Sequence, residues 1–519
     1  MAKAASNVVD LQAKGREVET KKVLKMVACA EKDRNRHIRR IEDCYKFGLP
    51  WRHKSNQNEP VDQLDEIFDE ELMTILEDFS SDMLNTFTPQ KSDWVEPKVM
   101  ATLDKADTKL VSEQLGKYKR VIFDEMARSN LYQALQEAYL DLGPGTMCVL
   151  VLDLDPAQPI HCEAIPSVDL LLNRGNYGRV DGIWRKRQRT DEDIAELWPS
   201  AKDKNGELYD PDGLVNHEVV DGCYRDHKVK SDETWRYCVI IDGHIAYSET
   251  YKGKGSCPLI PARWSRDATT AWGVGPTYRS MPAYKTLNHF RYLGLKNYDR
   301  TVDPPFSYES DGVMNFDHGI EPGTGIPRSP GSKAPEIMES KRQLDVEIFQ
   351  IDEVRASIRR AHYQDRPEQQ GKTPPTATQW ADEAAERARR MGTPATNLVL
   401  ELQYPLFYRF AYLLEKRGKL PKVQLNNSTI AVEPISPLLR AQEQEEVIRL
   451  DRFAEMLATR FGVEMANLII NTFEYAERLA ARLGIDPSLV RNEAQIKAAV
   501  EQLAPVLGGA GGAPTAEAA

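Results

Sequence analysis

Two stretches of helical pattern flank a segment that cannot continue a helix. Residues 276–302 and 342–364 are long enough for several helical turns, whereas residues 303–336 between them are crowded with glycine and proline. Proline removes a backbone donor and clashes with the preceding turn, and glycine raises the entropic cost of a helix. The second stretch places its branched apolar side chains on one seam, namely Leu344, Ile348, Ile351 and Ile358. The pattern predicts two helical arms with an irregular insert at their tip, stabilised by neighbours rather than by a core of its own.

Helical patterning also runs through the first 140 residues. One apolar stripe recurs at helical spacing and consists of Phe68, Leu72, Ile75, Leu76, Phe79 and Met83. Thr88-Pro89 is expected to end this helix, because proline disfavours helical geometry in the residue before it. A shorter helix, LYQALQEAYLDL, is expected to stop at Gly143-Pro144-Gly145.

Residues 147–265 change to a strand pattern. Short runs rich in β-branched and aromatic residues alternate with turn residues: MCVLVLDLD, GIWRKRQRT, TWRYCVII and HIAYSETY. Asp242-Gly243 joins the last two runs and predicts a tight hairpin, since glycine tolerates a positive φ. Together with a short helix near 191–198, this region predicts antiparallel β-structure in a chain of the α+β class that is predominantly helical.

The C-terminal part returns to helices. Residues 376–418 carry a strong helix pattern that Gly392-Thr393-Pro394 interrupts, which predicts a kink or break. A strand is predicted within 419–436. Three further helices are predicted at 437–461, 463–483 and 487–504. The Gly/Ala-rich tail, 506–519, is predicted to be disordered.

The charge balance argues against a protein that coats nucleic acid. The chain has 68 Lys and Arg against 79 Asp and Glu, a formal net charge of −11, whereas a coat protein neutralises phosphates with basic patches. Charge is divided unevenly: residues 14–54 hold 13 Lys and Arg and 6 Asp and Glu, while residues 61–90 hold 9 Asp and Glu and no Lys or Arg. Two interpretations stay open. The segments form solvated helix faces, or they meet between neighbouring copies in a head-to-tail contact that closes a ring.

The sequence predicts a soluble protein of a reducing cytoplasm. The seven cysteines are widely spaced without a CxxC pair, which predicts small buried thiols rather than disulfides or a zinc knuckle. The longest apolar run, MCVLVL at 147–152, is far shorter than the ~20 residues of a membrane-spanning helix. The N-terminus lacks the apolar core of a signal peptide.

No pattern of residues points to catalysis, a cofactor or a metal. Gly371-Lys372-Thr373 matches the end of a phosphate-binding loop, but Arg366 stands where its first glycine belongs. Gly273 and Gly275 form only a GxG that proline follows at once. His161-Cys162-Glu163 brings ligand types together, yet neighbours on a strand point to opposite faces. We therefore predict no enzymatic activity and no cofactor.

Four stretches, in this order, resemble the head-to-tail connector (portal) family of short-tailed, podovirus-type bacteriophages. They are TFTPQKSDWVEP, LYQALQEAYLDLGPGTMCVLVL, AWGVGPTYRSMPAYKTLNHF and TPPTATQWADEAAERARRMG. The resemblance covers residues from about 30 to 420, with Val274 departing from the larger polar residue expected in that turn.

The resemblance implies a portal-like architecture in a ring of twelve subunits. Its parts are a wing (1–275, with helices over 1–142 and β-structure over 147–265), a first stem helix (276–302), a clip (303–341), a second stem helix (342–364), a channel loop (365–375), a long kinked helix (376–418), a wing strand (419–436), crown helices (437–505) and a disordered tail (506–519).

The same resemblance implies partners and a place of action. The homo-dodecamer would sit at one capsid vertex of the virion after assembly in the host cytoplasm, with no membrane involved. Double-stranded DNA would pass through the channel without sequence specificity. Protein partners would be the major capsid protein, the scaffold, the terminase that hydrolyses ATP, the tail adaptor and internal core or ejection proteins.

Basic residues near the predicted channel are the candidate site. The channel loop and its DNA-facing side chains would comprise Arg366, Glu368, Gln369, Gln370, Gly371, Lys372 and Thr373. Arg355, Arg359 and Arg360 either pair with acids on adjacent stems or line the channel. Gly392 and Pro394 are predicted to act as a hinge that lets the channel loop shift.

Two other functions stay open at this level. One is a metal-dependent enzyme of the nuclease type that uses scattered Asp and Glu. The other is a monomeric adaptor or scaffold-binding protein of the virion. The arm–insert–arm order favours the conduit over both, since an enzyme has no evident use for so long an irregular insert.

Overall fold

The computed structural model describes most of the chain. The described residues are 2–52, 66–99, 105–155, 157–227, 233–302, 306–307, 336–337, 344–364, 390–420, 430–434, 451–457, 459–460 and 475. They fall into two compact units: residues 1–375 with 390–434, and residues 376–389 with 435–519. In the second unit, residues 451–457 and 459–460 are helical, within the first of the three predicted C-terminal helices. Residue 475 is also helical, within the second of these helices. The rest of that prediction lies outside the described residues.

The first unit combines helices with antiparallel sheets, so the predicted α+β class is confirmed. Its helices are α1 (Ala2–Gly48), α2 (Glu71–Phe87), α3 (Lys105–Arg128), α4 (Leu131–Leu140), α5 (Asp191–Leu197), α6 (Pro276–Val302), α7 (Leu344–Ala361), α9 (Gly392–Leu398) and α10 (Tyr404–Lys416). Its strands are β1 (Val95–Val99), β2 (Thr146–Leu152), β3 (His161–Ile165), β4 (Leu170–Arg174), β5 (Val180–Thr190), β6 (Asn216–Arg225), β7 (Thr234–Ile241), β8 (His244–Lys252), β9 (Leu259–Arg263), β10 (Phe306–Ser307), β11 (Glu336–Ile337) and β12 (Ile430–Pro434).

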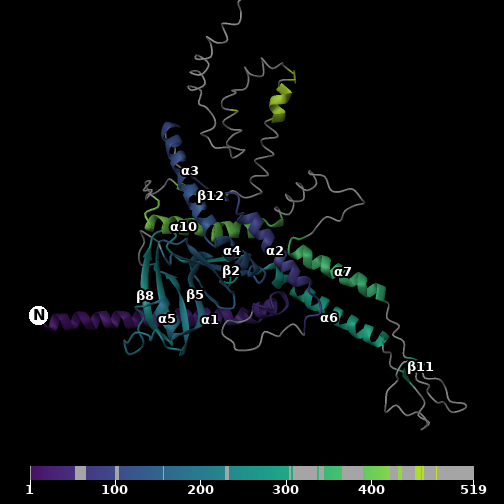
Figure 1. The fold of residues 1–519 in the computed structure, drawn as a ribbon, viewed down its shortest axis with the longest axis horizontal. Coiled ribbons are helices and arrows are strands. Elements are labelled where there is room, and N and C mark those ends of the chain that lie inside the picture. The colour runs from purple at the N-terminus through teal and green to yellow at the C-terminus, as the bar shows by residue number, and fades with distance from the viewer. Residues whose placement is uncertain are drawn as a thin grey trace, which may run out of the picture. The chain divides into compact units, whose positions relative to one another are not determined.

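The central layer is a five-stranded antiparallel sheet in the order β4-β5-β6-β7-β8 (Figure 1). A second sheet has the order β3-β2-β9. The predicted hairpin joins β7 to β8, and positive φ values of 47° at Asp242 and 81° at Gly243 confirm its tight turn. All four predicted strand runs and the helix near 191–198 are confirmed.

Helices cover both faces of the five-stranded sheet. On one face, Val23 and Ala30 of α1 pack against a buried cluster that includes Trp184. On the other face, Ile194 of α5 packs with Val219 and its neighbours. The alternation of side chains along each strand makes this two-sided burial possible.

Two expectations for the N-terminal region are wrong in part. The first 140 residues are not wholly helical, because β1 lies among them and pairs with β12, far along the chain. Phe68 does not belong to the apolar stripe of α2: it precedes the helix and is 37% exposed. The other five stripe residues are buried, and Thr88 ends α2 with its N–H bonded to Leu84 O, as predicted.

Candidate functional site at the base of a two-helix arm

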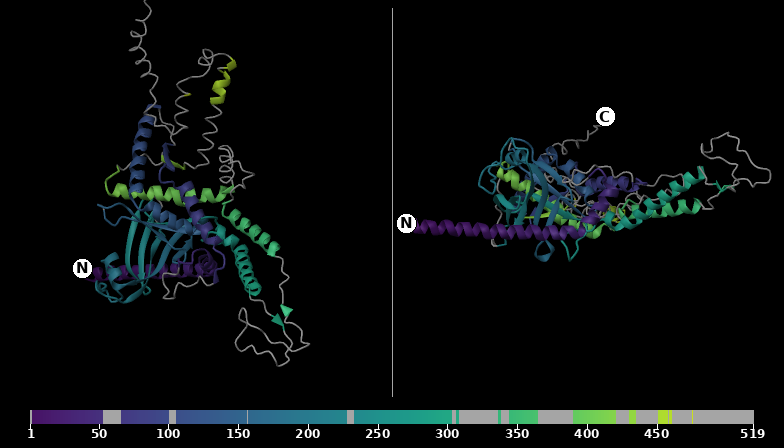
Figure 2. Two further views of the ribbon diagram at one scale, coloured as in Figure 1. Left: turned by 45° about the vertical axis from the view of Figure 1, so that its right-hand side comes forward. Right: turned by 90° about the horizontal axis from the view of Figure 1, so that it is seen from below.

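Helices α6 and α7 form the predicted pair of arms. Figure 1 and Figure 2 show them side by side, leading toward β11. Tyr284 and Leu287 of α6 share one buried cluster with Ile351 and Ile358 of α7. Beyond the helices, β10 and β11 pair with each other, and most of the insert lies outside the described residues.

The arm begins where two glycine-containing turns, residues 143–145 and 273–275, pack against each other. Thr277 and Gly275 donate backbone hydrogen bonds to Gly143 O (3.1 Å) and Pro144 O (3.2 Å). A Cβ on Gly275 would lie 2.0 Å from Gly143 O, so only glycine permits this approach. The predicted helix stop at 143–145 and the GxG at 273–275, which implied no nucleotide site, together fix where α6 begins.

A single buried carboxylate binds both helices of the arm. Asp69 Oδ2 accepts from Arg291 Nε of α6 at 3.0 Å and from Arg355 Nη2 of α7 at 2.8 Å. The Asp69 side chain is only 1% exposed. Its neighbour Glu71 accepts from Arg359 Nε at 2.6 Å. Charge-assisted bonds of this kind are stronger than neutral ones, so the short segment before α2 clamps the base of the arm.

The same segment is tied to α6 through uncharged groups. Asn288 Oδ1 accepts from the backbone N–H of Phe68 at 2.7 Å, and Asn288 Nδ2 donates to Glu66 O at 2.9 Å. The Tyr284 hydroxyl donates to Asp69 O. We call residues 66–71 the strap, because they cross the base of the arm and bond to both of its helices.

A buried histidine closes the junction between the first turn of α6 and the end of α7. His362 Nδ1 lies 2.9 Å from Ile358 O, and Nε2 lies 2.9 Å from Thr277 Oγ1. The carbonyl can only accept, so Nδ1 carries the proton and the Thr277 hydroxyl donates to Nε2. Burial lowers the pKa of His362 to about 4, which keeps the ring neutral.

The helix that follows residues 365–389 contains a π-helical segment, Val399–Gln403, between α9 and α10. Pro405 cannot donate a backbone hydrogen bond to Glu401, which accounts for the irregularity there. The Glu401 carboxylate accepts from Arg263 Nε at 3.1 Å and from Arg266 Nε at 2.8 Å. Because Arg263 is 1% exposed on β9, the π-helical segment is fixed to the second sheet.

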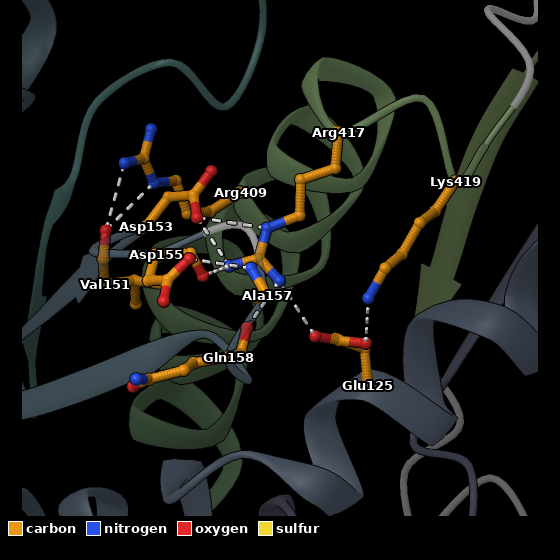
Figure 3. A network of polar contacts seen from close by, with 9 residues as sticks. All are labelled: Glu125, Val151, Asp153, Asp155, Ala157, Gln158, Arg409, Arg417 and Lys419. Carbon is orange, nitrogen blue, oxygen red and sulfur yellow. Dashed lines mark hydrogen bonds and ion pairs between the residues drawn. The ribbon is translucent and has the colours of Figure 1, made fainter.

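The far end of α10 is held by a network around Arg417 (Figure 3). Its guanidinium donates to Asp153 Oδ1 at 3.0 Å, to Glu125 Oε1 at 3.3 Å and to Gln158 O at 2.8 Å. About two helical turns earlier, within α10, Arg409 donates to Val151 O at 3.0 Å. Arg409 thus bonds α10 to β2, and Arg417 bonds the C-terminal end of α10 to α3 and to the loop between β2 and β3.

Arg355 and Arg359 pair with acids of the same chain, in the strap and at the start of α2. Arg360 is exposed. That these three arginines line a channel or lie between subunits stays a prediction. The acid-rich segment 61–90 likewise supplies partners within the chain: Glu66 pairs with Lys46.

The other predicted site residues are placed only in part. Residues 366–373, the whole predicted channel loop with Arg366 and Lys372, lie outside the described residues. Gly392 begins α9 directly after a break at Met391, and Pro394 lies in the first turn of α9. Their hinge function stays a prediction. The strap and the π-helical segment were not anticipated, although the sequence Tyr404-Pro405 inside a helical pattern was a signal for the latter.

Within the described ranges, no three His, Cys, Asp or Glu side chains gather so as to hold a metal ion. On β3, His161 is exposed and Cys162 is buried, while Glu163 pairs with Arg185 and Arg187. Across the same described part of the chain, no helix has the length and apolar character to cross a membrane.

Comparison with known proteins gives one family. The family model described as bacteriophage head to tail connecting protein matches residues 20–490. No curated protein matches the chain. Among solved structures, a chain of the virion of a native gene transfer agent particle is 11% identical, with 81% of this chain and 95% of that chain covered and a TM-score of 0.39. A chain of the neck of the empty particle, computed with C6 symmetry, is 11% identical, with coverage of 77% and 90% and a TM-score of 0.39. A chain of the neck of the native particle, computed with C12 symmetry, is 11% identical, with coverage of 76% and 90% and a TM-score of 0.36.

Proposed function

The chain belongs to the family of bacteriophage head to tail connecting proteins, and from this premise we propose that it forms a ring at one capsid vertex as the conduit for double-stranded DNA. The observation that carries the proposal is the arm of α6 and α7 with its clamped base. A connector must hold its position while DNA is driven through it. An arm whose two helices are bonded to one buried carboxylate is suited to that task.

We assign the parts of a portal to the chain on this basis. The wing would be residues 1–275, the stem α6 and α7, the clip 303–341 between them, and the channel loop 365–375. The long kinked helix would be 376–418, and the crown 437–505. The pairing of β10 with β11 supports the clip, since it brings the two ends of the insert together.

Electrostatics supports a conduit that does not grip DNA. Each phosphate contact adds affinity without regard to sequence and so adds friction. Twelve copies of a chain with net charge −11 carry 12 × −11 = −132, so that much of the ring repels DNA. Basic residues would act locally, where Arg366 and Lys372 enter the channel.

The proposed partners follow from the position at a vertex. The clip would bind the terminase during packaging and the tail adaptor afterwards. The wing would contact the major capsid protein and the scaffold, and the virion would be its final location. We propose no catalytic residue, because connectors are structural components and ATP hydrolysis would belong to the terminase.

Native mass tests the ring directly. Twelve copies of 58.8 kDa have a mass of about 12 × 58.8 = 706 kDa, and closed rings of neighbouring subunit number differ from this by one chain. Mass photometry of the purified full chain should find such a species, alone or after addition of the scaffold. A protein that stays monomeric with scaffold present, and forms no rings in negative-stain images, would refute the conduit.

Two variants test the channel itself. Neutralising Arg366 and Lys372 together to Gln should change DNA retention or packaging, while the same change at the exposed Lys202 and Lys204 of the wing should not. Unchanged retention across a salt series would remove both residues from the channel.

The hinge is tested by replacing Gly392 and Pro394 with Ala. The Cβ added at Gly392 meets no atom within 4 Å, so the variant should fold normally and any packaging defect would report on motion. Normal packaging and retention would show that these residues do not act as a hinge.

A further inference from the structure

The solvent-facing side of α1 carries a straight row of cations. Lys25, Lys32, Arg36 and Arg39 are all exposed, and their separations of 7, 4 and 3 residues return to the same face of a helix. At 1.5 Å per residue, the row is about 21 Å long. We call these four residues the α1 cationic row.

Several acids of α1 are engaged by partners elsewhere in the chain. Glu19 accepts from Tyr224 at 3.0 Å and pairs with Arg236, and Glu31 pairs with Lys186 at 3.1 Å. Asp33 accepts from the Thr270 hydroxyl at 3.0 Å and lies 3.9 Å from Arg36. Asp43 pairs with Lys285 of α6 at 2.7 Å, so these four acids have partners outside the row.

The row is a local concentration of positive charge in a chain with a net charge of −11. The burial of Val23 and Ala30 fixes the rotation of α1 about its axis, so the cationic row is held outward by packing rather than by chance orientation. Arg36 lies 3.9 Å from Asp33, which is a long contact for an ion pair. A fixed and exposed row of positive charge favours an anionic partner.

We propose that the α1 cationic row binds the phosphate backbone of double-stranded DNA on the outside of the assembled protein, apart from any DNA in the channel. This rests on the proposed function, because a connector that admits DNA into a closed shell exposes its outer surface to the packaged DNA. DNA carries one charge per ≈1.7 Å of its axis, so a straight row of this length lies against several phosphates. Lys and Arg that contact phosphates read no sequence.

A second copy of the chain is the other partner of suitable charge, and it fits less well. The exposed acids of α2, Glu77 and Asp78, are adjacent residues and offer a compact spot of charge. Two adjacent acids do not form a row of negative charge as long as the α1 cationic row, which is about 21 Å. In the strap, Glu66 already pairs with Lys46 of α1, and Asp69 and Glu71 pair with arginines of α7.

Covalently closed circular DNA separates outside binding from threading. Such DNA cannot pass through the channel of a ring that has already closed, so any binding to the assembled full chain occurs on the outer surface. The variant replaces Lys25, Lys32, Arg36 and Arg39 with Gln. A matched control removes the same charge from exposed cations elsewhere: Lys117, Arg120 and Arg128 of α3 and Lys204.

We expect the row variant to bind relaxed circular DNA at least tenfold more weakly at 0.1 M salt. In a plot of log affinity against log salt concentration, each phosphate contact contributes ≈0.9 to the magnitude of the slope. The loss of four contacts should therefore reduce that magnitude by about 3 to 4. The control should keep the slope of the unmodified protein. An equal loss of affinity in both variants would reveal only a general effect of charge. Unchanged affinity in the row variant would show that the row does not bind DNA. Either result overturns the proposal.

Native mass, measured on the same samples, keeps this result apart from the proposed function. If the row variant loses assembly but its remaining oligomers bind circular DNA normally, the row is a contact between copies and the proposal is wrong. If the unmodified protein forms no ring yet binds circular DNA through the row, the conduit fails while the DNA site stands.

Discussion

Acidification should loosen the base of the arm through one histidine. His362 is buried and neutral between Thr277 and Ile358, and burial holds its pKa at about 4 against an ordinary value of 6.5. When the junction opens, the ring meets water and regains its ordinary pKa. Below pH 6.5, His362 therefore binds a proton in the open state but stays neutral in the closed state, so closure becomes less favourable.

The size of the effect follows from the two pKa values. Each pKa unit corresponds to ≈1.36 kcal/mol, so the difference between 6.5 and about 4 limits the loss to roughly 3 kcal/mol. Between pH 7 and pH 5 the free energy of opening should fall by about 2 kcal/mol, since protonation of the open state is already partial at pH 6.5. The stability contribution is complete above pH 6.5 and is lost as the pH falls toward 4.

Hydrogen exchange measures this opening locally. After correction for the intrinsic exchange rates, the protection factors of amides in the last turn of α7 and the first turn of α6 should be about thirtyfold lower at pH 5 than at pH 7. The variant His362→Gln keeps polar atoms for both partners but does not titrate, so its protection should be independent of pH in this range. An equal pH dependence in the variant and in the unmodified protein would refute the assignment to His362.

Three further predictions have definite expected outcomes. Asp69→Asn removes the charge that two arginines share and should lower the urea-unfolding free energy by about 2 kcal/mol, since both arginines keep partial access to water; an unchanged urea midpoint would contradict the clamp. Burial alone would lower the pKa of His217, but hydrogen bonds to its two carboxylate partners outweigh burial and raise this pKa above 6.5. The contribution of His217 to the free energy of unfolding is therefore complete below pH 6.5 and declines as the pH rises through the pKa of the folded state. The variant His217→Gln should abolish that decline in urea titrations. Gly222→Ala would place a Cβ 2.2 Å from Ile183 O inside the central sheet and should cost about 3 kcal/mol, whereas Gly116→Ala on an open helix surface should be neutral or stabilising; similar melting temperatures for the two would contradict this packing.

Local sequence patterns predicted the elements whose cause is local. The helix over 276–302 was predicted at the bounds that α6 has, and the hairpin at Asp242-Gly243 was predicted at the right residues. In both cases the deciding interactions lie within a few residues: proline begins the helix, and glycine accepts the positive φ of the turn. Periodicity also identified the buried face of α2.

The arrangement of the site could not be read from the sequence, because its contacts join distant segments. Asp69 meets Arg355 across 286 residues, and Arg417 meets Asp153 across 264. Before the chain folds, any of the many carboxylates could serve either arginine. Short strands were missed for a related reason: β1 has only five residues, with a proline among them, and its partner β12 follows more than 300 residues later.

Helix α2 connects the two parts of the candidate site. At its N-terminal end, Glu71 and the strap bond to the arginines of α7. At its C-terminal end, Phe87 O accepts from Gln403 Nε2 of the π-helical segment at 2.5 Å. This helix of 17 residues does not shorten or bend at low cost, since its apolar face is packed along its length. The position of the arm and the position of the π-helical segment are therefore set by one rigid element, so a displacement of the arm that kept the strap bonded would have to carry the π-helical segment with it or break the bond to Gln403.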